Sequence, residues 1–314
     1  MRIAVLDDYQ RVAAGSADWS RLATHDVVFL HEPLGPADAV ARALADFEIL
    51  VAMRERTPFP AEVLLRLPRL RLLVTSGMRN RAIDLEAAAA RGIVVCGTES
   101  AGSPTAELTF GLILALARRI VEEDRRIRDG GWQSTVGVAL AGRTLGVIGL
   151  GGLGSRVARL GTAFGMHVVA WSRNLTAERA AECGAELVSK EELLSRADVV
   201  TIHLVLSERT RGLIGAAELA LMQPTAFLVN TSRGPIVDEQ ALLAVLEQGT
   251  IAGAGLDVYD EEPLLPDHPL RRAPNTVLTP HLGYVTGENY AVYFSQAVED
   301  VEAFLAGRPV RVLT

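Results

Sequence analysis

Three short segments, each following an apolar run, carry side chains suited to anion binding and proton transfer. They are NTSRG, LDVYDEEP and LTPHLG, which contain Arg233, Glu262 and His281. An arginine offers a rigid fork that binds a carboxylate and stabilises charge on a developing oxyanion. A histidine can pass a proton near neutral pH, and a carboxylate can hold the imidazole and favour its protonated form. Each residue alone also fits an ordinary turn, but together they suit the reduction of a 2-oxo acid by hydride.

The stretch VIGLGGLGSRVA joins a predicted strand to a predicted helix and has the G-x-G-x-x-G spacing of a dinucleotide-binding turn. Its first glycine, Gly149, permits the tight turn, and Gly151 lets the backbone approach the phosphates. Gly154 lets the helix and strand pack closely, and the helix N-terminus faces the negative charge. Such turns also arise for packing reasons alone, so the flanking strands and helix are what favour a cofactor site here.

One residue typical of an NAD site is absent. At the end of the next strand, HVVAW, an acid usually binds the ribose hydroxyls, whereas this chain has Ser172 and Arg173. Serine does not repel a 2′-phosphate, and a guanidinium can pair with one. We therefore predict a nicotinamide cofactor, NAD(P)(H), with NADP(H) slightly favoured. The alternative is that Arg173 faces solvent and Ser172 caps the helix that begins near Thr176, which would leave an NAD site.

The elements that must position these residues alternate along the chain. Short β-rich runs alternate with helical patterns, and this rhythm is typical of α/β folds with parallel sheets. Between the two halves of the pattern, one long helix is expected from Pro104 to about Asp129, with Ser103 as its N-cap. A final helix is expected from Glu288 to Leu305. The strands expected in the first third are RIAVLDD, EILVAM, RLLVTS and GIVVC, and those expected later are TLGVIG, HVVAW, AELVS, DVVTIHL, AFLVN, IAGAGLDV and NTVLTPH.

A chain of 314 residues is long for a single core, so two domains are expected. The fold class we predict is α/β with two Rossmann-like domains. A doubly wound parallel-sheet domain that binds the dinucleotide would span residues 101–286. A flavodoxin-like substrate domain, which is the catalytic domain, would combine residues 1–100 with residues 287–314.

The composition excludes several classes of function. The net charge of −7 disfavours nucleic acid and anionic membranes as partners. The longest apolar stretch, Phe110 to Ala117, is too short to cross a bilayer. The N-terminus lacks the pattern of a signal peptide, and two cysteines without a C-x-x-C motif fit a reducing compartment, so we expect a cytoplasmic protein. The six histidines lack the spacing of paired metal ligands, so no metal site is predicted.

Over essentially its whole length the chain resembles the D-isomer-specific 2-hydroxyacid dehydrogenases, the family of phosphoglycerate, glyoxylate/hydroxypyruvate and D-lactate dehydrogenases. The segments that carry the resemblance are GRTLGVIGLGGLGSRVA, DVVTIHLVLSERTRGLI, NTSRGPIVDEQALLAVLEQGTIAGAGLDVYDEEPL and TPHLG. The family fold consists of two similar α/β domains, and its members are usually dimers formed through the cofactor domain. The resemblance therefore implies a homodimer and a small 2-oxo or 2-hydroxy acid as substrate.

The resemblance also implies a role for each catalytic residue. Arg233 would bind the substrate carboxylate and polarise the reacting carbonyl, His281 would be the general acid/base, and Glu262 would be the acid paired with His281. The backbone N–H groups at Ser76 and Gly77 would receive the substrate carboxylate. Asp257 would lie near the nicotinamide carboxamide. The residues we assign to the cofactor are Gly149, Gly151, Gly152, Leu153, Gly154, Ser172, Arg173, Thr231 and Asp257.

The substrate loop departs from the family pattern. It reads SGMRNRAID where relatives have G-V-G-x-D-N-I-D, so that Arg79 replaces a glycine and Arg81 an acid. With Arg54 and Arg56, which follow the strand EILVAM, up to four cations could surround the far end of the substrate and suit a second anionic group. The alternative is that they face solvent or pair with nearby acids. The residues we assign to the substrate are Arg54, Ser76, Gly77 and Arg79.

Two further departures lie near the proposed catalytic groups. Val205 stands where a proline is usual, two residues after His203, and the bulky Tyr284 follows His281 where small residues are common. Neither departure removes a catalytic group. We predict an oxidoreductase that reduces a 2-oxo acid to a D-2-hydroxy acid, or runs the reverse reaction, with NAD(P)H. The alternative is a non-enzymatic, corepressor-like protein that senses NAD(H); we favour the enzyme because the chain shows no disordered extension for partner binding.

Overall fold

A computed structural model describes residues 1–314, and the chain divides into two compact units. Unit 1 consists of Met1–Gly102 and Val285–Thr314, and unit 2 consists of Ser103–Tyr284. The chain thus leaves unit 1 once and returns to it once. Every strand pairing in both sheets is parallel, which confirms the predicted α/β class.

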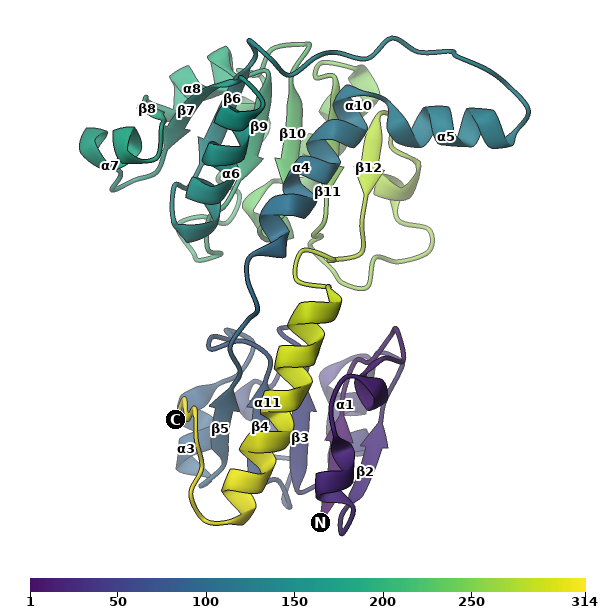
Figure 1. Cartoon of the computed structure of the whole chain (residues 1–314), viewed down its shortest axis with the longest axis vertical. Helices are drawn as coiled ribbons and strands as arrows, with labels where there is room; N and C mark the ends of the chain where they lie inside the picture. Colours follow the sequence, from purple (N-terminus) through teal and green to yellow (C-terminus); the bar gives the residue numbers. More distant parts are fainter. The chain divides into compact units, whose positions relative to one another are not determined.

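Unit 1 is built on a five-stranded sheet with the strand order β2-β1-β3-β4-β5 (Figure 1). This order is the flavodoxin-like one. The strands are β1 (Arg2–Val5), β2 (Asp26–Phe29), β3 (Ile49–Ala52), β4 (Leu72–Thr75) and β5 (Val94–Gly97). The sequence reading missed β2, which pairs with β1 at the edge of the sheet and whose residues are only partly buried or exposed, so it lacks the continuous apolar run of the central strands.

The helices of unit 1 cover both faces of its sheet. A hydrophobic core lies between one face of this sheet and three helices. It is formed by residues of β1, β3, β4 and β5 and of α1 (Ala37–Leu44), α2 (Ala61–Leu64) and α3 (Leu85–Ala90). The long helix α11 (Gly287–Leu305) contacts β4. Two short 3₁₀ helices, η1 (Ala13–Gly15) and η2 (Trp19–Leu22), follow β1. The last residues of the chain return to β5, where Leu313 donates its N–H to the Val95 carbonyl at 2.7 Å.

Unit 2 is built on a seven-stranded sheet with the order β12-β11-β10-β9-β6-β7-β8. Counted from its first strand, β6, this is the doubly wound order of dinucleotide-binding sheets with one more strand at the end. The strands are β6 (Thr144–Ile148), β7 (His167–Trp171), β8 (Glu186–Leu187), β9 (Val199–Ile202), β10 (Phe227–Asn230), β11 (Gly253–Leu256) and β12 (Thr276–Leu278).

Two hydrophobic cores lie on opposite faces of the unit 2 sheet, because alternate strand residues point to opposite sides. Val199 belongs to the core under α4 and α6, whereas Val200 and Ile202 belong to the core under α8, α9 and α10. Figure 1 shows α4 and α6 on the same face. The helices are α4 (Pro104–Ala117), α5 (Ile120–Arg128), α6 (Gly152–Ala163), α7 (Ala177–Glu182), α8 (Lys190–Arg196), α9 (Ala216–Leu219) and α10 (Glu239–Gln248), with 3₁₀ turns η3 (Gly234–Ile236) and η4 (Pro269–Arg272).

The single helix expected from Pro104 to Asp129 is wrong. The helix ends at Ala117 and a second one, α5, starts at Ile120, because Arg119 adopts a left-handed conformation with φ of +52°. The carbonyl of Ala117 accepts a hydrogen bond from the N–H of Val138 at 2.7 Å, so the returning segment takes an acceptor that a continuous helix would use itself. None of the helices combines the length and the apolar character needed to span a membrane.

Candidate active site

The carboxyl ends of the strands in unit 2 gather the predicted cofactor and catalytic residues along one edge of the sheet. This follows from the parallel pairing, because all parallel strands end on the same side. Gly149 follows β6, Ser172 follows β7, Thr231 follows β10 and Asp257 follows β11. Sequence positions far apart are therefore placed side by side by the topology alone.

The glycine-rich turn has the shape that a pyrophosphate requires. Gly149 has a φ of +98°, and a Cβ there would lie 2.7 Å from the His203 carbonyl oxygen. A Cβ on Gly154 would lie 1.9 Å from the Gly149 carbonyl oxygen, so only glycine allows this contact between turn and helix. A Cβ on Gly151 or Gly152 would meet nothing within 4 Å, which leaves open space at the start of α6. A phosphate fits there against the helix N-terminus.

Ser172 and Arg173 lie in the turn between β7 and α7. The Ser172 carbonyl accepts the N–H of Leu175 at 3.0 Å, whereas the cap of α7 is Thr176, whose hydroxyl accepts the N–H of Arg179 at 3.2 Å. The alternative in which Ser172 caps this helix is therefore wrong. Arg173 is exposed and makes no ion pair or side-chain hydrogen bond within the chain, so its guanidinium is available to a ligand.

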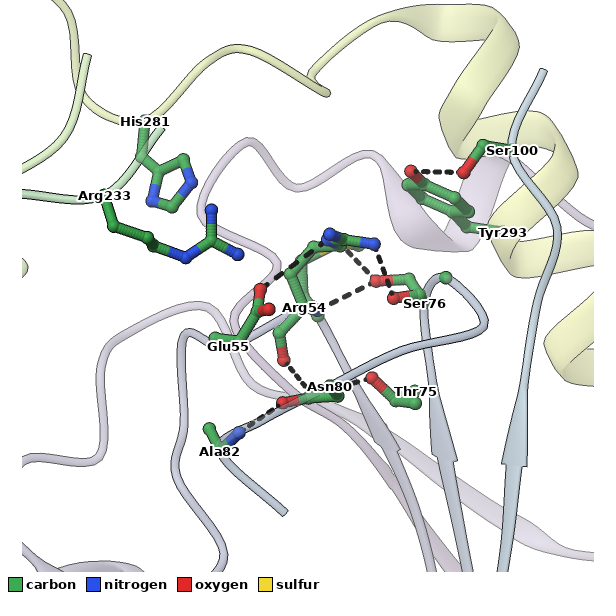
Figure 2. Close-up of polar contacts among 12 residues, drawn as sticks. Arg54, Glu55, Thr75, Ser76, Asn80, Ala82, Ser100, Arg233, His281 and Tyr293 are labelled. Carbon is green, nitrogen blue, oxygen red and sulfur yellow. Dashed lines mark hydrogen bonds and ion pairs between the residues drawn. The ribbon is translucent and has the colours of Figure 1, made fainter. Parts of the chain in front are cut away.

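Arg233 is held by its backbone. Asn230, only 1% exposed, donates its side-chain N–H to the Arg233 carbonyl at 2.9 Å and accepts the Ser232 N–H at 3.0 Å. A Cβ on the next residue, Gly234, would lie 2.1 Å from the Tyr259 carbonyl carbon, so the turn after β10 packs directly on the chain that follows β11. Figure 2 shows the side chains of Arg233 and His281 extending in the same direction from their two loops.

His281 and Glu262 form the predicted pair. The Nδ1 atom of His281 lies 2.6 Å from Glu262 Oε2, and the other carboxylate oxygen accepts the N–H of Tyr259 at 2.9 Å. This pairing orients the ring and leaves Nε2 without a partner in the chain, as a proton-transferring nitrogen requires. His281 has a φ of +56°, and its ring meets the ring of Tyr284 edge-on, with centroids 5.6 Å apart.

Asp257 is fully buried and holds the loop that carries His281. Its carboxylate accepts the Thr279 hydroxyl at 2.6 Å, the Leu282 N–H at 2.7 Å and the Gly283 N–H at 2.8 Å. Burial raises the pKa of this carboxyl group, although the three hydrogen bonds oppose the shift. Within the chain, the contacts of Asp257 are thus those of a residue that positions the His281 loop.

Two other predicted or neighbouring residues are less suited to chemistry. The Thr231 hydroxyl lies 2.9 Å from the Thr109 hydroxyl, which ties the end of β10 to α4. His203, at the end of β9, has its Nε2 atom 3.0 Å from the Thr201 hydroxyl, and burial lowers its pKa to about 3. Because His203 stays neutral at ordinary pH, His281 is the histidine of this edge that can donate a proton.

In unit 1, the predicted substrate loop follows β4, but its donors differ from those expected. The Ser76 N–H donates to the Ala52 carbonyl at 3.1 Å, and the Gly77 N–H donates to the Thr98 hydroxyl at 2.9 Å. Both N–H groups assigned to the substrate carboxylate are therefore engaged within the protein. The next two, of Met78 and Arg79, make no hydrogen bond in the chain, so they are the donors of this loop that an anion can reach.

Asn80 shapes this loop and was missed by sequence reasoning. It is 8% exposed, and its side-chain N–H group donates to the Arg54 carbonyl at 2.6 Å and the Thr75 hydroxyl at 2.8 Å (Figure 2). Its side-chain oxygen accepts the Ala82 N–H at 2.9 Å. An asparagine directly after a strand end is a signal for such a turn, since its side chain bonds nearby backbone.

Of the four arginines expected near the far end of the substrate, Arg54 and Arg56 have partners within unit 1. Arg54 pairs with Glu55, with 3.7 Å between Nε and Oε2. The Arg56 guanidinium lies 4.5 Å from the centre of the Tyr9 ring and donates to the Asp7 carbonyl at 2.7 Å. Arg79 and Arg81 are exposed. The alternative of pairing with nearby acids thus holds for Arg54.

Known proteins resemble the chain over most of its length. Residues 110–283 match the family model described as "D-isomer specific 2-hydroxyacid dehydrogenase, NAD binding domain". A glyoxylate reductase from Aeropyrum pernix is 45% identical over 257 residues, which are 79% of this chain and 77% of the relative. A D-3-phosphoglycerate dehydrogenase from Archaeoglobus fulgidus is 37% identical over 277 residues, 87% of this chain and 52% of the relative, so the chain spans about half of that protein.

Solved structures give the same picture. A crystal structure of a phosphoglycerate oxidoreductase from Vibrio cholerae O395 superposes with a TM-score of 0.92 and 36% sequence identity. The match covers 98% of this chain and 99% of the other, so both units have their counterpart there.

Proposed function

The chain belongs to the D-isomer specific 2-hydroxyacid dehydrogenase family, and we propose that it reduces a small 2-oxo acid to the corresponding D-2-hydroxy acid. The observation that carries this proposal is the Glu262–His281 pair, 2.6 Å apart, on the sheet edge that also presents Arg233 and the glycine-rich turn. The residues present fit a nicotinamide dinucleotide, because the turn at Gly151 and Gly152 leaves open space at a helix N-terminus. When bound, the reduced cofactor supplies a hydride.

The chain's own groups complete the reaction. Protonated His281 donates the proton on Nε2 to the substrate's 2-oxygen as that oxygen gains negative charge, and Glu262 stabilises the imidazolium through Nδ1. Arg233 stabilises the charge on the oxygen and binds the carboxylate. Within unit 1, the open N–H groups of Met78 and Arg79 are suited to binding a carboxylate. One hydride and one proton convert the carbonyl to an alcohol, and the reverse reaction uses His281 as the base.

The test compares two histidine–glutamate pairs of unit 2. His268 lies 3.0 Å from Glu239 and is about as buried as His281, but it stands in the turn before η4. We expect His281→Ala to lower kcat for a 2-oxo acid by about 10³-fold, whereas His268→Ala retains most of the activity. The activity of both variants is measured with a panel of 2-oxo acids, from the change in absorbance as the reduced cofactor is oxidised. Equal activity of the two variants would contradict the proposal, and so would cofactor binding without turnover by the wild type.

For the cofactor, we propose a preference for NADP(H) over NAD(H). The support is the exposed Arg173 after β7, with no acid beside it to repel a 2′-phosphate. Arg173→Ala is expected to lower the ratio of kcat/KM for NADPH to that for NADH about tenfold, the effect of losing one charged hydrogen bond. Arg272→Ala, which removes an exposed arginine of the same unit, serves as the control. A wild-type preference for NADH that Arg173→Ala leaves unchanged would reject the proposal.

We also propose that the protein forms a homodimer through α5 and the segment that follows it. No residue of α5 is buried, and Figure 1 shows the helix projecting beyond the rest of unit 2. Ile120, Ile127, Trp132 and Val136 are 51%, 50%, 71% and 95% exposed. Apolar side chains gathered on one projecting segment indicate a protein interface. Light scattering should show that the wild type is a dimer and that the Trp132→Asp variant is a monomer. A monomeric wild type would contradict the proposed interface.

A further inference from the structure

An ion pair stands beside the substrate loop of unit 1, directly after β3. Figure 2 shows the Glu55 carboxylate facing the Arg54 side chain, and the distance from Arg54 Nε to Glu55 Oε2 is 3.7 Å. The two side chains are 25% and 20% exposed. The charges of a pair that is largely withdrawn from water are less screened than those of a surface pair. They therefore affect the binding of a charged ligand next to the pair.

The position of Arg54 is fixed by the loop itself. Its N–H donates to the Ser76 hydroxyl at 2.8 Å, and its carbonyl accepts the Asn80 side chain at 2.6 Å. These bonds hold Arg54 in a left-handed conformation with φ of +51°, which costs energy for a residue with a side chain. The backbone bonds therefore place this arginine at the loop rather than elsewhere on the edge of the sheet.

The guanidinium of Arg54 lies across Gly77. A Cβ on Gly77 would be 2.0 Å from Arg54 Nη1 and 3.2 Å from Cζ, so the side chain occupies space that only a glycine leaves free. The same Nη1 atom lies 3.4 Å from the Ser76 carbonyl oxygen. The Arg54 side chain thus lies against Gly77. The open N–H groups of the loop belong to the next two residues, Met78 and Arg79.

Arg56 does not add its charge to that of Arg54 at this position. Arg56 is turned toward the start of the chain, where its guanidinium lies over the Tyr9 ring and donates to the Asp7 carbonyl. The pairing at the end of β3 therefore offsets the charge of Arg54, while Arg79 and Arg81 keep exposed side chains further along the chain.

We propose that Glu55 is a specificity-determining residue, which neutralises Arg54 and restricts the enzyme to 2-oxo acids that carry a single negative charge. A substrate with a second carboxylate or a phosphate that reached Arg54 would also meet the Glu55 carboxylate, and would have to separate the pair. This inference rests on the proposed function, because it takes loop 76–80 as the site of the substrate carboxylate. It reverses the expectation from the sequence that the arginines favour a second anionic group.

The experiment measures the ratio of kcat/KM for a dianionic 2-oxo acid, oxaloacetate, to that for a monoanionic one, glyoxylate. We expect this ratio to rise at least tenfold in Glu55→Gln, which keeps the side-chain shape and removes the charge. The control Glu86→Gln removes the same charge from an exposed position on α3 and should leave the ratio unchanged. In the double variant Arg54→Gln/Glu55→Gln the gain should disappear, since the cation that Glu55 offsets is removed as well.

A second measurement does not depend on turnover. Oxamate carries one carboxylate and N-oxalylglycine carries two, and neither is reduced. Calorimetric titration should show that Glu55→Gln binds N-oxalylglycine at least tenfold more tightly relative to oxamate than the wild type does, with Glu86→Gln again as control. The gain should shrink at high ionic strength, because it is electrostatic.

The outcomes separate the two proposals. If the wild type reduces glyoxylate but Glu55→Gln changes neither ratio, the role of Glu55 is overturned and the proposed function stands. If the wild type reduces no 2-oxo acid but Glu55→Gln still shifts the binding ratio, the proposed function fails, whereas the exclusion of a second anion by Glu55 stands as a property of binding. A wild type that already prefers oxaloacetate, or binding ratios that Glu86→Gln shifts as much as Glu55→Gln, would also overturn the role of Glu55.

Discussion

In unit 2 the three proposed catalytic side chains follow three adjacent strands, β10, β11 and β12, whereas in unit 1 the proposed substrate contacts come from the ends of β3 and β4. Both are edges of parallel sheets, but the two loops present different parts of the chain. The loop at residues 279–283 presents a side chain, His281. The loop at residues 76–80 presents backbone N–H groups.

The buried residue that anchors each loop matches what the loop presents. Asp257 is a carboxylate and accepts hydrogen bonds from two backbone N–H groups of its loop. These N–H groups are not needed for substrate binding, because that loop acts through the imidazole of His281. Asn80 instead donates to a carbonyl and a hydroxyl and accepts the N–H of Ala82, whereas the N–H groups of Met78 and Arg79 stay open. An acid in place of Asn80 could not donate these bonds. The chemistry of the anchoring side chain thus differs between the two loops, as do the groups that each loop presents.

The largest effect that would sharpen this comparison is expected at Arg233. Arg233→Ala removes the group proposed to stabilise the oxyanion, and kcat/KM for the 2-oxo acid should fall about 10³-fold. The dissociation constant of the reduced cofactor, measured by fluorescence titration, should change little, because the glycine-rich turn is intact. A variant with ordinary kcat/KM would remove Arg233 from the catalytic groups.

A smaller effect is expected at the anchor of unit 2. Asp257→Asn replaces an acceptor of three hydrogen bonds by an amide whose own N–H group must face the Gly283 N–H or, in the other orientation, the Leu282 N–H and the Thr279 hydroxyl. The His281 loop should lose its fixed position, and kcat should fall about 10²-fold, since small misplacement of a reacting group is costly. Stopped-flow measurement of a single turnover separates this loss from slow product release. If cofactor affinity falls while the single-turnover rate holds, Asp257 binds the cofactor and does not position the loop.

The anchor of unit 1 should affect binding rather than turnover. Asn80→Ala removes the bonds to the Arg54 carbonyl and the Thr75 hydroxyl, so the open N–H groups lose their geometry. KM for the 2-oxo acid should rise about tenfold, as expected for one or two lost hydrogen bonds, while kcat changes less. Steady-state kinetics at saturating cofactor gives both constants. A fall in kcat alone would contradict the division of roles between the two loops.

The smallest effect is on stability and lies outside both loops. Asp300 in α11 is fully buried, and burial raises its pKa to about 7, although its partner Arg311 opposes the shift. Because the folded pKa is above the unfolded value of 3.8, the unfolded state loses its proton first, and stability falls as the pH rises between these values. From pH 6 to pH 7 the free energy of unfolding should fall by about 1 kcal/mol. Urea unfolding of wild type and Asp300→Asn checks this: the variant should lack that slope, and activity should be unaffected.

Part of the site could be predicted from the sequence because its signals are local. The spacing of Gly149, Gly151 and Gly154 indicates a strand, a turn and a helix. A Cβ atom on Gly149 or on Gly154 would clash with a backbone carbonyl oxygen, which is why glycine is needed at both positions. Arg233, Glu262 and His281 each follow a strand that its apolar run identifies. The break between α4 and α5 could not be predicted, because it depends on Val138, a residue that returns from further along the chain to the Ala117 carbonyl.

The α/β class, the parallel sheets and the cofactor turn can be predicted from local patterns, since the periodicity of apolar residues and the need for glycine at a tight turn act over a few residues. The fold was needed to show which backbone N–H groups of loop 76–80 are open, that Arg54 pairs with Glu55, and that Asp257 bonds to the His281 loop. These properties depend on hydrogen bonds and ion pairs formed by side-chain geometry and by segments from different strands. A linear pattern contains the partners but not the distances between them.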